Sequence, residues 1–177
     1  MRKKIGITIK DTGDLGEVIK NIEKLKSRKI KVGVFGGEKH EGSDIDLVDL
    51  ASIHEYGCDI PVTPKMRAWF AYNGYPLKKS TTVIRIPERS FIRSGFDENV
   101  DKIADKVQEV IPSVLESEVD PDIFMNAIGL EFAGLIQKKL RSIQDPPNSQ
   151  MTIDRKGSSN PLQDTGQLVE SIRHEVE

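Results

Sequence analysis

Two residues that could act in catalysis, His54 and Cys58, lie four positions apart in the sequence. A cysteine nucleophile needs a neighbouring base and a third group that orients that base. We expect His54 to face outward from the end of a helix and Cys58 to begin a loop, and catalytic partners are brought together by the fold rather than by adjacency in the chain. We therefore predict no catalytic residue and no enzymatic activity.

Residues of metal-binding types are present, but their spacing does not predict a metal site. The three histidines are widely separated: His40, His54 and His174. Asp44 opens a run of acids that is similar to a calcium loop, and Glu55 occupies its twelfth position. The sixth position, however, holds Asp49 where such a loop needs glycine. The apolar residues between these acids favour a helix instead.

A glycine-containing segment, residues 33–37, follows a predicted strand, as phosphate-binding loops do. It lacks the Lys-Ser/Thr pair of a P-loop and the three spaced glycines of a dinucleotide-binding turn. We interpret it as a turn that ends the strand, and we predict no cofactor.

The strongest positive signal is a stretch that combines cations with large side chains, which includes Lys65, Met66, Arg67 and Trp69. A second basic stretch follows and contains Arg89, Arg93 and one further arginine. Three interpretations are open. The residues form a protein interface, where Trp, Met and Arg are enriched; they contact DNA phosphates; or the aromatic rings belong to the core and the cations are solvated.

Charge is distributed unevenly along this chain of 177 residues, although its net charge is only −2. Residues 60–95 carry seven Lys or Arg against one acid, whereas residues 97–135 carry ten acids against two lysines. This asymmetry indicates either a charge-complementary contact or solvated faces that cancel within the fold. The net charge near zero argues against a nucleic-acid-binding module, which usually has a basic excess.

The composition, with 37% hydrophobic and 31% charged residues, indicates one modest core beneath a charged surface. No apolar run approaches 18 residues and no signal-peptide pattern occurs, so we expect neither a membrane span nor secretion. Cys58 is the only cysteine, which fits a reducing compartment.

Hydrophobic periodicity predicts alternating strands and amphipathic helices, followed by a long loop. The predicted strands are residues 4–10, 30–35 and 80–86. The predicted helices are residues 14–27, 44–56, 66–72, 88–111 and 121–143, and Pro112 is expected to break or kink the chain. Residues 144–166 are predicted to be a loop that orders on a partner, and residues 167–177 a short helix or a terminal strand.

Six segments, in this order, carry a resemblance to a known family: KVGVF (31–35), IHEYG (53–57), IPVTPKM (60–66), IPERSFIR (86–93), TIDRKGSS (152–159) and PLQDTGQL (161–168). Together they resemble the phage virion morphogenesis, or tail completion, family. The resemblance covers about residues 30–176, and it rests on the combined order of the motifs rather than on any single one.

The resemblance implies an α+β fold in which a small, mainly antiparallel sheet packs against two long helices, followed by a long C-terminal loop. It also implies a structural protein that assembles with itself into a hexameric ring, at the head–tail junction or the tail end of a virion. Its partners would be other phage neck and tail proteins and DNA that passes without sequence-specific contact. It would be found in the virion, and in the host cytoplasm during assembly.

We therefore expect a core domain at residues 1–143, with residues 58–86 as a hairpin insertion, and an extended C-terminal arm at residues 144–177. Arg89 and Arg93 are expected on one helix face, where both meet carboxylates of a neighbour. The candidate interface residues are Lys65, Met66, Arg67, Trp69, Arg89, Arg93, Leu162, Thr165 and Leu168. A nucleic-acid-binding module is the alternative function.

Overall fold

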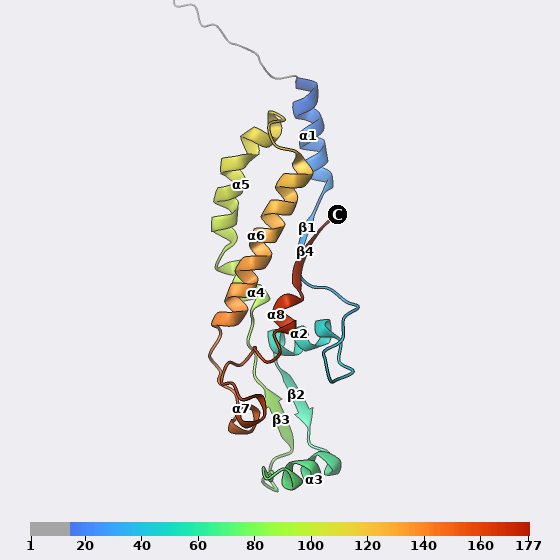
Figure 1. Cartoon of the computed structure of the whole chain (residues 1–177), viewed down its shortest axis with the longest axis vertical. Helices are drawn as coiled ribbons and strands as arrows, with labels where there is room; N and C mark the ends of the chain where they lie inside the picture. The colour runs from blue at the N-terminus through green and yellow to red at the C-terminus, as the bar shows by residue number, and fades with distance from the viewer. Residues whose placement is uncertain (1–14) are drawn as a thin grey trace, which may run out of the picture.

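A computed structural model describes residues 15–177 and shows an elongated α+β molecule (Figure 1). The predicted strand at residues 4–10 lies outside the described residues. The helices are α1 (Leu15–Ser27), α2 (Leu47–Tyr56), α3 (Pro64–Tyr72), α4 (Ile92–Asp97), α5 (Val100–Leu115), α6 (Pro121–Ser142), α7 (Gln150–Lys156) and α8 (Gln167–Glu170). The strands are β1 (Ile30–Val34), β2 (Cys58–Pro61), β3 (Val83–Ile86) and β4 (Ile172–Val176).

The four strands form two separate antiparallel pairs instead of a single sheet. Strand β1 pairs with β4, so that Ile30 lies opposite Val176 and Val34 opposite Ile172. Strand β2 pairs with β3, and α3 lies between them in the chain. The predicted α+β class with long helices is confirmed.

Helix α6 is the central element, because both hydrophobic clusters of the described residues include its side chains. One end of α6 contributes Phe124 and Ile128 to a cluster with α1 and α5. Its other end contributes Ala133, Ile136 and Leu140 to a cluster with α2, α8 and β4. The β1–β4 pair lies along α6, and the β2–β3 hairpin extends away from this body toward α3 (Figure 1).

The single helix predicted at residues 88–111 is wrong, because the structure contains two helices there, α4 and α5. Asn99 separates them, and its side-chain amide donates to the carbonyl of Gly95, which gives the last turn of α4 a partner outside the helix ladder. Short polar side chains compete with the helix ladder in this way. The sequence pattern missed the break because the apolar stripe continues through it.

Pro112 does not break the helix, because α5 continues through it to Leu115, so the break that was one of the two predicted effects does not occur. A proline removes one backbone donor and crowds the preceding turn. Pro112 is exposed and lies near the end of α5, while Val114, two residues further, is fully buried in the second cluster. We infer that this packing holds the last turn in place.

Residues 144–166 are not a continuous loop, because they contain α7. The hydroxyl of Ser149 accepts from the N–H of Thr152 at the start of α7, and Gly157 ends it in the left-handed conformation. Both capping residues are visible in the sequence. Residues 167–177 form a short helix and then a strand, and Leu168, Val169 and Ile172 complete the core cluster around α6.

Gly129 shows how closely β4 approaches α6. A Cβ atom at Gly129 would lie 2.5 Å from the His174 ring, whereas a Cβ atom at Gly134, on the same helix, meets nothing within 4 Å. We expect Gly129→Ala to destabilise the protein by about 1–3 kcal/mol through overpacking. Gly134→Ala should stabilise it by about 0.5–1 kcal/mol through helix propensity.

Urea denaturation of the two variants and the wild-type protein measures this difference directly. Equal effects of the two substitutions would contradict the close packing of β4 on α6.

Candidate functional site

Glu55 forms the junction between the body and the β2–β3 hairpin. It lies in the last turn of α2, and its side chain is only 4% exposed. One carboxylate oxygen accepts from the backbone N–H groups of Phe91 and Ile92, at 2.8 and 2.9 Å. The other accepts from the N–H of Arg93 at 2.9 Å and from the Ser90 hydroxyl at 2.6 Å. The carboxylate thus caps the first turn of α4, where negative charge is favourable.

These donors keep Glu55 ionised despite its burial. Desolvation by itself raises the pKa of Glu55, but the Ser90 hydroxyl and the N–H groups of Arg93, Ile92 and Phe91 bind the charged form. The pKa of this carboxyl is therefore below its ordinary value. Both oxygens of the buried Glu55 carboxylate accept hydrogen bonds, and a buried charge costs little free energy of folding only when it is hydrogen-bonded in this way.

Arg93, a predicted interface residue, is engaged within its own chain. Its guanidinium donates to the Glu55 carboxylate at 3.1 Å, to the Glu55 carbonyl at 3.0 Å and to Glu88 at 2.6 Å. It also lies 4.8 Å from the centre of the Tyr56 ring. This arginine therefore reinforces the junction, although half of its side chain is exposed to solvent.

Arg89 does not lie on an exposed helix face, so the prediction that places it there beside Arg93 is wrong. Helix α4 begins after it, at Ile92, so Arg89 and Arg93 do not share a helix face. Arg89 is 6% exposed, and its guanidinium donates to the carbonyls of Pro146 and Pro147 at 2.7 and 3.0 Å. Arg89 therefore holds the segment that follows α6 against the junction.

Gly57 is the position at which the two strands of the hairpin leave the junction. Its φ angle is +73°, and a Cβ atom there would lie 2.9 Å from the backbone of both Ile86 and Glu88. Only glycine fits such a close approach in the left-handed region. The IHEYG and IPERSFIR segments thus meet in space, and their residues form one structural unit.

Helix α3 lies at the far end of the hairpin and carries the exposed part of the basic-aromatic stretch (Figure 1). Lys65, Trp69 and Tyr72 are spaced at helical intervals, and all three are exposed. Trp69 is 43% exposed and Tyr72 is 91% exposed. We call these three residues the α3 face. The interpretation that Trp69 is a core residue is wrong.

Other candidate residues are partly or fully buried. Met66 is half-buried, and Arg67 donates to the carbonyls of Leu77, Lys78 and Thr81, which closes the loop between α3 and β3. Leu162 and Leu168, which we predicted at an interface, are core residues with 6% and 7% exposure. The spacing of these two leucines in the sequence does not distinguish a residue buried within its own chain from a residue that contacts a neighbouring copy. Thr165 is exposed.

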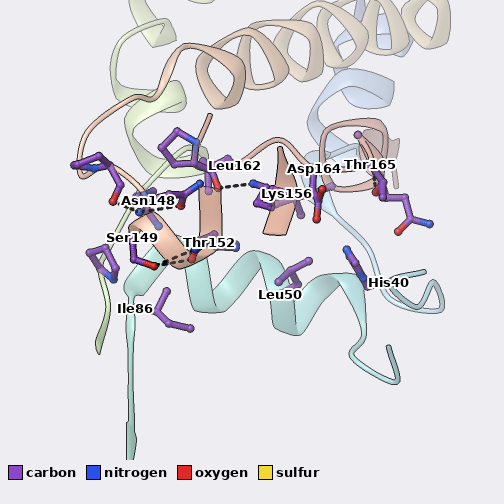
Figure 2. A pocket seen from close by; sticks show the side chains of 18 of the residues that line it. His40, Leu50, Ile86, Asn148, Ser149, Thr152, Lys156, Leu162, Asp164 and Thr165 are labelled. Atoms are coloured by element: carbon purple, nitrogen blue, oxygen red, sulfur yellow. Dashed lines mark hydrogen bonds between the residues drawn. The ribbon is translucent and has the colours of Figure 1, made fainter. Parts of the chain in front are cut away.

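A pocket of about 600 Å³ lies beside the junction, between α2, β3 and the segment around α7 (Figure 2). His54 lines it, and the sequence prediction that His54 faces outward is wrong: its Nδ1 atom is buried and finds no hydrogen-bond partner within residues 15–177. Burial, followed by the positive charges of Arg89 and Lys156, lowers the pKa of His54 to about 4. Sequence reasoning did not find this pocket, because its walls come from distant segments.

No group of three His, Cys, Asp or Glu side chains in residues 15–177 is placed to hold a metal ion. Cys58 is partly buried and begins β2 instead of a loop. In the same residues, no helix has the length and apolar character needed to cross a bilayer.

Comparison with known proteins returned no matching family model, no matching curated protein and no matching solved structure.

His54 should make stability depend on pH between about 6.5 and 4.5. In the unfolded chain its imidazole binds a proton near pH 6.5, whereas in the folded protein it does so only near pH 4. The unfolded state therefore binds more protons in this window, and stability falls as pH falls, by up to about 3 kcal/mol. We expect His54→Gln to flatten this part of the profile.

The measurement is urea denaturation at several pH values between about 6.5 and 4.5, where the carboxyl groups, Glu55 among them, contribute equally to both profiles and cancel in the comparison with His54→Gln. Parallel profiles for the wild-type protein and His54→Gln would contradict the burial of a neutral histidine.

Proposed function

We propose that this protein is a structural component of a phage neck or tail end, which assembles with itself into a ring during virion formation. The proposal draws on the resemblance of its ordered motifs to the tail completion family. The observation that carries it is the presence of two exposed surfaces of opposite charge on different parts of the molecule. A ring requires such a heterologous contact, in which one patch meets a different patch on the next copy.

The first surface is the end of the hairpin around the α3 face. Beside Lys65, Trp69 and Tyr72, the exposed side chains of Lys78 and Lys79 add positive charge. None of these three lysines forms an ion pair with the described residues. Exposed aromatic rings flanked by cations are typical of residues that contribute most to protein interfaces.

The second surface is an acidic stripe along α4 and α5, made of Asp97, Asp101, Asp105 and Glu109. These residues recur every four positions, so the three on α5 share one helix face. All four are exposed and form no ion pair within residues 15–177. Neighbouring acids do have partners, since Glu98 pairs with Lys139 and Glu131 with Lys106. Within residues 15–177 the stripe is thus negative charge without an ion-pair partner.

In the proposed ring, the α3 face of each copy contacts the acidic stripe of the next. The sequence indicated a charge-complementary contact between residues 60–95 of one copy and residues 97–135 of the next. We restrict this contact to the two surfaces described above, because Arg67, Arg89 and Arg93 form hydrogen bonds within their own chain. Six copies would enclose a channel through which DNA passes without sequence-specific contact. The ring would bind other neck and tail proteins, and it needs no enzymatic activity or cofactor.

A nucleic-acid-binding module remains the second candidate, because exposed aromatic rings beside lysines also suit bases and phosphates of single strands. If this second candidate is correct, the protein binds DNA, the affinity falls steeply as the salt concentration rises, and binding is lost when Lys65 and Lys78 are replaced by glutamate. The net charge of −2 favours the assembly role.

Charge reversal tests the ring directly. We expect Lys65→Glu/Lys78→Glu and Asp101→Lys/Asp105→Lys each to abolish self-association, because each places like charges at the contact. Mixing the two variants should restore it, since alternating copies then pair opposite charges around a ring with an even number of subunits. Light scattering at increasing concentration should show a mass near six times 19.8 kDa for the wild-type protein and for the mixture.

Lys138→Glu is the matched control, because this exposed lysine on α6 lies outside both surfaces. Variants that associate as the wild-type protein does, or a mixture that stays dissociated, would contradict the proposed contact.

A further inference from the structure

The pocket beside the junction has an excess of positive charge. Five basic side chains line it: His40, His54, Arg85, Arg89 and Lys156, of which Arg85 is paired with Asp59. Arg89 donates to the carbonyls of Pro146 and Pro147, and Lys156 to the carbonyls of Asn160 and Pro161. These partners are neutral, and Asp164 is the one carboxylate among the residues that line the pocket.

The charges of the pocket affect one another. Burial lowers the pKa of Lys156, the positive charge of Arg89 adds to this effect, and only Asp164 opposes it. Arg89 and Lys156 likewise disfavour protonation of His54. Burying cations beside one another costs free energy, which an anion placed among them would offset.

The other side chains of the pocket walls are apolar or uncharged and polar, and the walls are far enough apart for more than a simple anion. Figure 2 shows Leu50 and Ile86 on one side, facing Thr152, Lys156 and Leu162 on the other. A volume of about 600 Å³ lies within the range of sites that enclose organic ligands. The lining therefore suits a ligand with both apolar groups and a negative charge.

One wall of the pocket is the free edge of β3. Val62 and Thr82 lie opposite each other, and the N–H of Val62 donates to the carbonyl of Thr82. In an antiparallel pair of strands, every second residue directs its backbone N–H and C=O groups toward the partner strand. The backbone groups of Val83 and Arg85 therefore point away from β2. Neither residue has a backbone hydrogen bond on that side within residues 15–177. Residues 84–87 line the pocket together with α7, which lies beside β3 in Figure 1.

We propose that the pocket binds an extended segment of another protein, which adds as a strand to the free edge of β3 and places an acidic side chain among Arg89, Lys156 and His54. The edge supplies main-chain hydrogen bonds, the apolar walls take up alternate side chains, and the cations Arg89 and Lys156 select the acid. The acids in residues 15–177 lie mostly on helices, in turns or on the paired strands β2 and β4, so we assign the segment to a different protein. The proposal does not depend on ring formation.

The test is a titration of the full chain with a fluorescent, capped peptide of alternating valine and glutamate, followed by fluorescence anisotropy. The same peptide with glutamine in place of glutamate is the control ligand. We expect the glutamate peptide to bind about tenfold more tightly, because hydrogen bonds to charged groups are stronger than neutral ones. A glutamate peptide that is N-methylated on the backbone facing β3 should lose binding.

Two variants locate the site. Lys156→Met should weaken binding of the glutamate peptide about tenfold, whereas Lys102→Met, an equal change of charge on exposed α5, should leave it unchanged. Leu50→Glu places a carboxylate opposite Lys156 (Figure 2) and should abolish peptide binding even if Lys156→Met fails to fold.

Several outcomes would overturn the proposal: equal binding of the glutamate and glutamine peptides, no binding of either, or no effect of Leu50→Glu. Binding of inorganic phosphate but not of peptide would also overturn it, since the pocket would then be a simple anion site.

Discussion

A single buried carboxylate holds the two parts of this molecule together. Glu55, at the end of α2, satisfies the first backbone N–H groups of α4, and in doing so it fixes where the returning strand β3 enters the body. Phe91, the first of these donors, is fully buried in the core cluster around α6. The guanidinium of Arg93 forms an ion pair with the Glu55 carboxylate, and the guanidinium of Arg89 donates to the segment that leads to α7. The direction of the hairpin, the start of α4 and one wall of the pocket all follow from this contact.

This constraint separates residues that build the protein from residues that are free to meet a partner. Arginines are enriched at interfaces, and they were natural candidates in the sequence. In the structure, Arg67, Arg89 and Arg93 each satisfy groups of their own chain. The exposed surfaces are instead made by Lys65, Trp69 and Tyr72 at one end, and by acids in an unbalanced stripe on α5. An elongated body with such separated surfaces suits repeated contact between copies.

The amphipathic helices α1 and α6, strand β1 and the overall α+β class were predictable, because hydrophobic periodicity reports directly which face of an element is buried. The break between α4 and α5 was not, since Asn99 interrupts the backbone ladder without interrupting the apolar stripe. The burial of Arg89 and of the Nδ1 atom of His54 was equally hidden, because it depends on residues 144–166 folding back over the junction. Local pattern carries no information on such contacts between distant segments. The capping signals of α7, Ser149 and Gly157, were present but short.

Hydrogen exchange at the amides of Phe91, Ile92 and Arg93 tests the central role of Glu55 most directly, in the wild-type protein and in Glu55→Gln. The neutral amide keeps the shape of the side chain but offers one acceptor oxygen where the carboxylate offers two. If the junction holds the fold, these amides exchange slowly in the wild-type protein and about 100-fold faster in Glu55→Gln, matching a loss of about 3 kcal/mol. Glu88→Gln, which alters only the exposed contact with Arg93, leaves them protected. Equal exchange in Glu55→Gln and Glu88→Gln would contradict the account.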